Sequence, residues 1–279
     1  MNTGLDVGST TAKIVRLESG IITASKVVPS HRWKELLEYG NKWDTVETIA
    51  TVETTEAIQT PEATEIIQTT ETIQTTETIQ TTETAETIVS TGYFRKTVPH
   101  TAAITEITAA SLGVRYYIPD AQVIVDVGGQ DTKVIDLRNN TFLINDKCSA
   151  GTGAFLELAA HYFDIPVESL GKLHTRASRC ARINNTCGVF AISEMISQLV
   201  GGYTMEEVIC GIHQAFARRI AQMIPPVETV VLIGGTVLNQ GLVESFESIH
   251  GSTVIVPPSP QTVNALGAAL YGKKLRPEQ

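Results

Sequence analysis

The sequence predicts an α/β protein that consists of two related halves. Segments with the alternation of β-strands are interspersed with segments of helical periodicity. A strand, a polar turn that contains glycine and a second strand occur at residues 4–17 and again at residues 123–135, about 120 residues later. A chain of 279 residues suits one large domain or two of moderate size.

The net charge of −9 has a local origin. Nine glutamates lie between residues 45 and 88, where Lys and Arg are absent, and the rest of the chain carries 21 acidic and 21 basic residues. This neutral remainder offers no broad basic surface for nucleic acid. An apolar run long enough for a bilayer and a signal-peptide pattern are both absent. Four cysteines without a C-x-x-C pair favour neither a disulfide scaffold nor a zinc site. We therefore expect a soluble, cytoplasmic, reduced protein.

The first strand–turn–strand motif could bind a phosphate. Its turn, Gly8-Ser9-Thr10-Thr11, presents backbone N–H groups and hydroxyls together, and Asp6 in front of it could hold hydrated Mg²⁺. By itself, the pattern also fits an ordinary hairpin turn. A third strand is expected at residues 21–28 and a short helix at residues 31–39.

A low-complexity segment follows, with a Thr-Thr-Glu-Thr-Ile-Gln unit that is clearest at residues 68–84. Its even period would place isoleucines six apart on a helix, which is a poor apolar seam, and its many threonines disfavour helix. We expect a mobile acidic insertion, or irregular surface strands, at about residues 45–86. We assign it no catalytic role.

The motif returns in the middle of the chain. A strand at residues 87–93 and a helix at residues 101–112 precede the apolar strand Val123–Val127, which leads into Gly128-Gly129-Gln130-Asp131. Asp126 takes the place that Asp6 has in the first motif. The repetition indicates two halves that face one nucleotide, each with a carboxylate for the metal and a turn for phosphate.

A third strand-to-turn junction completes the set. The strand at residues 230–233 enters the turn Gly234-Gly235, and a helix is expected at residues 241–249. Glycines at such a turn let the backbone approach a flat ligand such as adenosine.

Two cysteines each precede a helix. Cys148 comes before the glycine-rich turn at residues 151–153 and the helix expected at residues 154–160, and Cys187 comes just before a helix that begins near Val189. Helix N-termini favour anions such as a thiolate or a metal–thiolate centre. The alternative is two buried free cysteines that pack as small hydrophobes.

The other two cysteines lack such a turn. Cys180 lies in a polar run, and Cys210 lies within an amphipathic helix expected from Met205 to Ile220. We interpret both as ordinary thiols, with the alternative that one of them is a metal ligand.

In this order the motifs resemble those of the activator ATPases of 2-hydroxyacyl-CoA dehydratases, a family that includes the ATP-binding subunits of benzoyl-CoA reductases. The motifs are Asp6-Val7-Gly8-Ser9-Thr10, Asp126–Asp131, Asn145-Asp146-Lys147-Cys148, Cys187–Ala191 and Gly234-Gly235. The resemblance covers nearly the whole chain except about residues 40–86. It implies the actin/Hsp70/sugar-kinase fold, with two ribonuclease-H-like halves around an ATP cleft. We place the first half, with its insertion, at residues 1–113, and the second, with the cluster ligands and dimer interface, at residues 114–279.

The resemblance also implies the chemistry. A homodimer would hold one [4Fe-4S] cluster between its subunits, and ATP hydrolysis would drive an electron into a 2-hydroxyacyl-CoA dehydratase or a similar iron–sulfur enzyme. Ferredoxin or flavodoxin would be the electron donor. Such a cluster takes four thiolates, so the simplest ligand set is Cys148 and Cys187 from each subunit.

The expected nucleotide site draws on all three turns. Asp6, Asp126 and Gln130 are the expected catalytic residues, and the expected ligands of ATP and Mg²⁺ are Gly8, Ser9, Thr10, Thr11, Lys13, Gly128, Gly129, Gln130, Gly234, Gly235 and Asn239. The family usually has glutamate where Ile192 stands and glycine where Phe94 stands, and these departures bear on the partner. Two other functions fit the same turns. One is a small-molecule kinase, which needs an acceptor pocket and has no use for paired cysteines. The other is a non-redox, actin-like regulatory ATPase.

Overall fold

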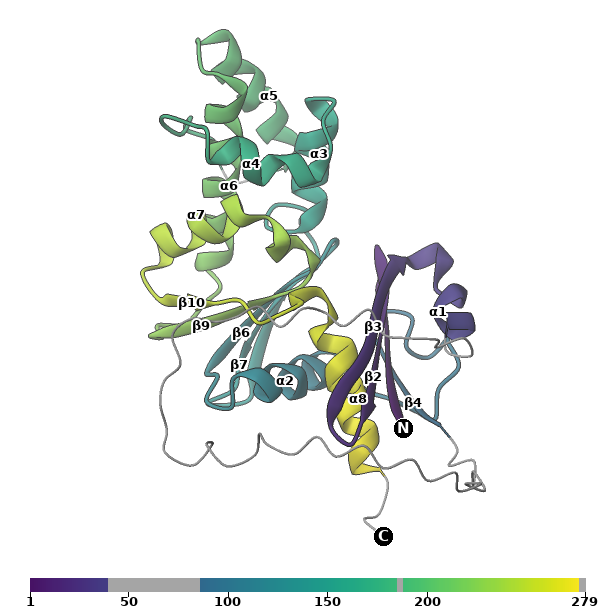
Figure 1. Cartoon of the computed structure of the whole chain (residues 1–279). Coiled ribbons are helices and arrows are strands. Elements are labelled where there is room, and N and C mark those ends of the chain that lie inside the picture. Colours follow the sequence, from purple (N-terminus) through teal and green to yellow (C-terminus); the bar gives the residue numbers. More distant parts are fainter. Residues whose placement is uncertain (40–85, 185–187, 276–279) are drawn as a thin grey trace, which may run out of the picture.

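The computed structural model describes residues 1–39, 86–184 and 188–275. It contains two five-stranded sheets with two helices between them, and a group of helices extends beyond the second sheet (Figure 1). The Thr/Glu/Ile/Gln repeat and Cys187 fall outside the described residues, apart from Glu86 at the end of the repeat. Glu86 accepts a hydrogen bond from Thr3 and pairs with Arg16 at 3.3 Å, so the chain rejoins the first sheet there.

The two sheets have the same topology. In each, three strands that are consecutive in the sequence pair antiparallel. The fourth strand pairs in parallel with the first, and the fifth pairs in parallel with the fourth. The first sheet, ordered β3-β2-β1-β4-β5, contains β1 (Asn2–Val7), β2 (Thr11–Glu18), β3 (Ile21–Pro29), β4 (Thr87–Thr91) and β5 (Ala102–Ala103). The second, ordered β10-β9-β6-β7-β8, contains β6 (Val123–Val127), β7 (Thr132–Asp136), β8 (Thr141–Asn145), β9 (Thr229–Ile233) and β10 (Thr253–Ile255). The expected two related halves are confirmed.

Two helices join the halves, namely α2 (Glu106–Tyr117) and α8 (Val263–Lys274) (Figure 1). Their backbones touch, because a Cβ on Gly267 would lie 1.8 Å from the carbonyl oxygen of Ala109, and one on Gly113 would lie 2.1 Å from that of Val263. Although α8 ends the described chain, it packs on the first sheet, where Ala265, Leu266 and Ala269 contact Val15 and Leu17. The boundary near residue 113 stays a prediction, and the C-terminal helix belongs to the core of both parts.

The start of α2 differs from the expected helix at residues 101–112. Ala102 and Ala103 pair with β4 as the short strand β5, and the helix begins only at Glu106. Thr105 is the N-cap, and its hydroxyl accepts a hydrogen bond of 3.1 Å from the Thr108 N–H. The shift places Glu106 at the first turn of a helix that begins between the two sheets.

All but one of the remaining described helices gather on the second half, where they cover and extend its sheet (Figure 1). They are α3 (Gly153–Tyr162), α4 (Leu170–His174), α5 (Gly188–Val200), α6 (Met205–Ala221) and α7 (Gln240–His250). A short helix, α1 (Lys34–Tyr39), lies in the first half, and 3-10 turns occur at Ser30–Arg32, Val167–Ser169, Gly235–Leu238 and Pro260–Thr262. The expected amphipathic helix is α6, whose apolar face (Val208, Ile212 and Phe216 among others) is buried in the largest core cluster. A capping box between Thr204 and Glu207 fixes its start.

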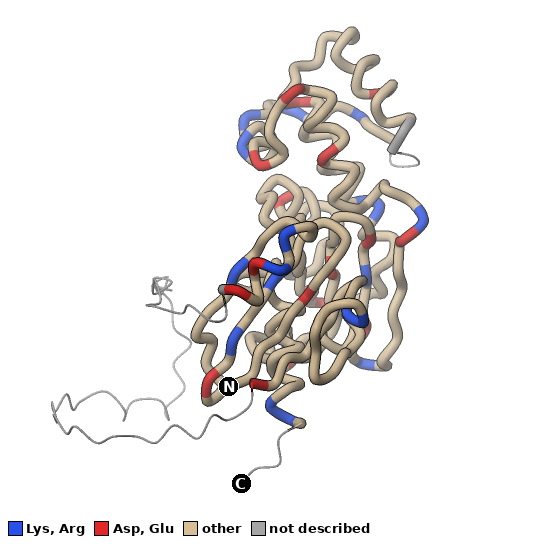
Figure 2. The backbone as a smooth tube through the Cα atoms, turned by 90° about the vertical axis from the view of Figure 1, so that its right-hand side faces the viewer, with Lys and Arg blue, Asp and Glu red and all other residues tan. Residues whose placement is uncertain are grey.

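Charged residues do not segregate by sign. Acidic and basic residues are interspersed along the described chain (Figure 2). Within that part of the chain, no helix is both long enough and apolar enough to cross a bilayer.

Candidate functional site

The two phosphate-type turns predicted from the sequence meet in space. A Cβ on Gly129, in the turn after β6, would lie 2.3 Å from the hydroxyl of Thr10, in the turn after β1. Both turns close in the same way, because the Gly8 N–H donates to the Thr11 carbonyl at 3.1 Å and the Gly128 N–H donates to the Asp131 carbonyl at 2.9 Å. The two halves therefore bring equivalent turns close to each other.

A carboxylate stands at the base of each turn. Asp6 is 3% exposed and Asp126 is 5% exposed, and each lies opposite a lysine on the neighbouring strand. The Lys13 ammonium lies 3.1 Å from Asp6, and the side-chain amide of Asn264 donates to Asp126 at 2.9 Å. A buried pair of carboxylates at facing turns can hold a hydrated divalent cation between the halves.

Glu106 is a third carboxylate beside these turns, and sequence reasoning did not single it out. It pairs with the buried Lys133 at 3.4 Å, and Asp131 pairs with the same ammonium at 2.7 Å. Burial raises the pKa of Glu106, and the Lys133 ammonium opposes this shift while Asp6 and Asp126 add to it. Burial lowers the pKa of Lys133, but the surrounding carboxylates outweigh burial and leave it above its ordinary value. Glu106 lies here because α2 begins at this residue. The sequence feature that could have indicated this start is Thr105, the N-cap residue before it.

The third turn adjoins the second. Gly234 has a φ of +101°, and a Cβ there would lie 2.4 Å from the Val127 carbonyl oxygen and 3.0 Å from an Asp126 oxygen. Only glycine fits this approach without strain. Gly235 faces open space, because no atom lies within 4 Å of the position its Cβ would take. The end of β9 thus lies beside the carboxylate end of β6, and Gly235 opens into free volume.

Both polar atoms of the Asn239 side chain form hydrogen bonds within the protein. It is the N-cap of α7, where its side-chain oxygen accepts from the Leu242 N–H at 3.3 Å. This contact orients the amide so that its nitrogen donates to Nε2 of His213 at 2.9 Å. His213 must then carry its proton on Nδ1, which faces Nδ1 of His174 at 3.1 Å. Burial, reinforced by His174, lowers the pKa of His213 to about 3.

The loop that carries Cys148 leads into a helix that is hydrogen-bonded to the second glycine turn. The side-chain amide of Asn145 donates to the carbonyls of Cys148 at 3.1 Å and Ala150 at 2.9 Å. At the start of α3, the N–H groups of Gly153 and Ala154 donate to the carbonyls of Gly128 at 2.9 Å and Gly129 at 2.8 Å. The first N–H groups of this helix therefore hold the second turn.

Cys148 is half-buried and forms no disulfide. Cys187 lies outside the described residues, and α5 begins at the next residue, Gly188. Among residues 1–39, 86–184 and 188–275, no group of three or more His, Cys, Asp and Glu side chains is placed to hold a metal ion.

The interpretation of Cys180 and Cys210 as separate thiols is wrong. They are joined in a disulfide, with their Cα atoms 4.9 Å apart. No local pattern predicts this bond, because the two residues are 30 positions apart and only the path of the segment after α4 along α6 brings them together.

The structure thus brings the three predicted nucleotide turns close together. Gln130 is at the second turn with an exposed side chain. The turns come from both sheets, and the sheets share one topology. This arrangement defines an ATP-hydrolysing enzyme of the actin/Hsp70/sugar-kinase fold, with two similar halves around its cleft. More particularly, the chain belongs to the BadF/BadG/BcrA/BcrD ATPase family, which it matches over residues 3–272.

Several proteins that are similar to this chain are named as activators of dehydratases. The 2-hydroxyisocaproyl-CoA dehydratase activator of Clostridioides difficile is 38% identical over 192 residues, which cover 66% of this chain and 72% of that protein. The activator of lactoyl-CoA dehydratase of Anaerotignum propionicum is 40% identical over 191 residues, covering 66% and 74%. A solved structure of the activator of the 2-hydroxyisocaproyl-CoA dehydratase from Clostridium difficile with bound ADPNP gives a TM-score of 0.77 at 32% identity, and the match covers 100% of this chain and 98% of that one.

Proposed function

We propose that this ATPase is an electron-donating activator. Two copies of the chain would hold one [4Fe-4S] cluster, and ATP hydrolysis would drive a low-potential electron into a partner 2-hydroxyacyl-CoA dehydratase or a related reductase. The relatives named as dehydratase activators support this role. A small electron carrier of the ferredoxin or flavodoxin type would supply the electron, and the reaction belongs in the reducing cytoplasm.

The cysteines fit such a cluster. Cys148 has a thiol that is not consumed in a disulfide and is only half-buried, so it can reach a shared centre at the surface. Cys187 immediately precedes α5. Two ligands in one chain leave a four-thiolate cluster incomplete, which calls for the same pair from a second copy. Once bound, the cluster supplies one-electron redox chemistry.

One observation carries the proposal, namely the hydrogen-bonded link between the nucleotide turn and the Cys148 loop. The carbonyls of Gly128 and Gly129 accept the first N–H groups of α3, and the residues just before α3 form the loop back to Cys148. A shift of this turn on nucleotide binding would therefore move the loop of a cluster ligand.

In the cleft, the chain's own residues have distinct tasks. Asp6 and Asp126 would hold Mg²⁺ through water, with Lys13 beside Asp6. The turns at residues 8–11 and 128–131 would hold the phosphates, and the Gly234-Gly235 turn would approach the adenosine. Gln130 would position the attacking water.

The experiment is anaerobic purification followed by iron analysis and visible absorption. The wild-type dimer should carry about four irons, whereas Cys148→Ala and Cys187→Ala should each lose the cluster absorption. Cys210→Ala is the matched control and should keep it. Iron at wild-type stoichiometry in Cys148→Ala would remove this ligand assignment. An iron-free wild-type protein that phosphorylates a small hydroxyl compound would instead be a kinase.

A further inference from the structure

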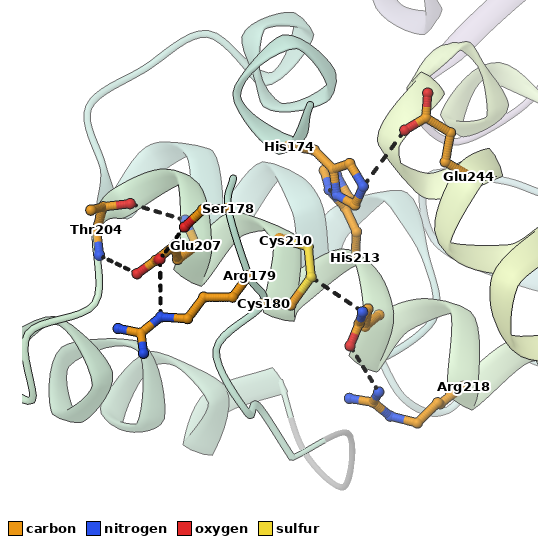
Figure 3. The surroundings of a disulfide bond; sticks show 11 residues. His174, Ser178, Arg179, Cys180, Thr204, Glu207, Cys210, His213, Arg218 and Glu244 are labelled. Atoms are coloured by element: carbon orange, nitrogen blue, oxygen red, sulfur yellow. Dashed lines mark hydrogen bonds and ion pairs between the residues drawn. A yellow bond between two sulfur atoms is a disulfide. The ribbon is translucent and has the colours of Figure 1, made fainter. Parts of the chain in front are cut away.

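The Cys180–Cys210 disulfide closes a loop around a predicted cluster ligand. Cys180 lies in the segment between α4 and α5, and Cys210 lies in the second turn of α6 (Figure 3). The residues between them, 181–209, include all of α5 and Cys187. The bond therefore links the segment that precedes α5 covalently to α6.

The segment around Cys180 does not need the disulfide to keep its path. Glu207, on α6, accepts hydrogen bonds from Ser178 at 2.8 Å and from Arg179 at 3.0 Å (Figure 3). The backbone of Glu207 accepts from the Ala181 N–H at 2.9 Å. Farther along α6, the Arg218 guanidinium donates to the Ile183 carbonyl at 3.2 Å. These contacts would keep the two sulfurs close in the reduced state, so the bond can form and break without refolding.

The two sulfurs differ in access. Cys210 is 5% exposed in the helix core, whereas Cys180 is half-buried and lines a cleft of about 630 Å³ between its own segment, α5 and α6. The side-chain amide of Gln214 donates to the Cys180 sulfur at 3.2 Å. Such a donor stabilises a thiolate on Cys180. An incoming thiol can therefore reach Cys180 but not Cys210.

The cleft is suited to an anion. Arg182 and Arg218 line it together with Cys180, and Glu194 is the one carboxylate among the described lining residues. Cationic surroundings favour a thiolate and attract a negatively charged thiol. In a reducing compartment, the disulfides that do occur are usually transient, catalytic or redox-sensing.

We propose that Cys180 and Cys210 are a redox-active pair that exchanges with a small anionic thiol through Cys180. The thiolate of the small thiol attacks the Cys180 sulfur, forms a mixed disulfide and releases Cys210 as a thiolate, which takes up a proton. A second molecule of the thiol then attacks the mixed disulfide. The protein gains two thiols, and the two small thiols leave as their disulfide.

The first test is a redox titration of the native, anaerobically purified chain with glutathione as the probe. After acid quenching and alkylation, peptide mass spectrometry reads each cysteine separately. The varied quantity is the square of the glutathione concentration divided by the concentration of glutathione disulfide. As this ratio rises roughly a hundredfold, the fraction of the pair in the disulfide form should fall from about nine-tenths to about one-tenth. A bond that opens only after denaturation, or thiols that stay free at every ratio, would overturn the proposal.

Two matched variants test the route of exchange. Cys210→Ser should trap one glutathione on Cys180, whereas Cys180→Ser should leave Cys210 unmodified in the folded protein. Equal modification of both would contradict the assigned access. Arg182→Gln should slow the reaction with glutathione by about three- to tenfold and leave that with neutral 2-mercaptoethanol unchanged. Circular dichroism and ATP hydrolysis should match the wild type in all three variants. Because these readouts need no iron, they can fail independently of the proposed activator function.

Discussion

At the scale of single residues, Asp6 and Asp126 show one arrangement used twice. Each is a buried carboxylate at the end of a central strand, opposite a lysine on the next strand. Asp6→Asn keeps the shape and removes the charge, so Mg²⁺-dependent ATP binding should be lost and kcat/KM for ATP should fall by at least about a hundredfold. The exposed Asp120 provides the control, since Asp120→Asn should hydrolyse ATP normally. A normal rate in Asp6→Asn would mean that the two turns do not bind the metal nucleotide.

Gln130 has a different task in the same cleft, because its exposed amide can orient water but is not needed to hold Mg²⁺. Gln130→Ala should therefore bind ATP with an unchanged Kd and hydrolyse it roughly a hundredfold more slowly. Isothermal titration and phosphate release measure the two quantities separately. Loss of binding together with turnover would assign Gln130 to nucleotide binding instead.

His213 makes stability depend on pH. It is buried in its neutral form, and its pKa falls to about 3 in the folded chain against about 6.5 when unfolded. Below pH 6.5 the unfolded chain binds a proton that the folded chain does not. The free energy of unfolding therefore decreases as the pH is lowered. Between pH 7 and pH 5, this group alone should remove about 2 kcal/mol of unfolding free energy.

The measurement is urea unfolding at pH 5, 6 and 7. His213→Gln should show a weaker loss of stability at pH 5 than the wild type, by about the 2 kcal/mol that this histidine contributes. The exposed His161 supplies a control, because His161→Gln should keep the wild-type dependence. Identical pH dependence in the wild type and His213→Gln would show that the buried histidine is not the cause.

These residues also show what sequence can and cannot supply. Asp6 and Asp126 could be predicted because each follows an apolar strand and precedes a glycine turn, which is a local signal. Glu106 follows an N-cap threonine, but no local pattern marks either Glu106 or His213 as part of a site, because their neighbours in space come from distant elements. The Cys180–Cys210 bond was missed for the same reason.

At the scale of elements, the contact between α2 and α8 joins the two halves. A methyl group on Gly267 would lie 1.8 Å from the Ala109 carbonyl oxygen, so the two helices must move apart to accept it. Gly267→Ala should destabilise the protein by about 1–3 kcal/mol, although alanine is the better helix former. Gly272→Ala in the same helix meets its nearest atom at 3.2 Å and should be close to neutral. Thermal unfolding of the two variants compares them directly, and equal midpoints would contradict this close approach.

The acidic repeat should be dispensable for catalysis. Between residues 45 and 88 it contains no cysteine, histidine, aspartate or glycine that could serve the site. Deleting one six-residue unit within residues 68–84 should leave iron content and ATP hydrolysis within about twofold of the wild type. The deletion leaves Glu86, which contacts the first sheet, in place. A large loss of either activity or iron would show that the segment packs in the first half.

Elements with a clear period were predicted well, and the exceptions have physical causes. Val123–Val127 and the helix from Met205 follow their patterns closely. The edge strand β8 was not expected, because four of its five residues are exposed and apolar residues occupy both of its faces. The helix expected at residues 101–112 begins only at Glu106, because Ala102 and Ala103 pair with β4 as a short strand.

At the scale of the whole molecule, we propose that the ATP site and the cysteine loop act as one unit. The second turn contacts Thr10 of the other half on one side and α3 on the other. If nucleotide binding shifts the two halves, the Cys148 loop must follow. A ligand changes a distant site only through its differential affinity for two states, and the coupling is reciprocal.

The most direct test is the midpoint potential of the cluster in the nucleotide-free, ADP-bound and transition-state-analogue-bound dimer. Coupling of about 1–3 kcal/mol predicts potentials that differ by roughly 40–130 mV for a one-electron couple. Cluster reduction should change nucleotide affinity by the same factor. Identical potentials in all three states, in protein shown to bind the nucleotides, would contradict the account and leave an ATPase whose cluster is not coupled to its cleft.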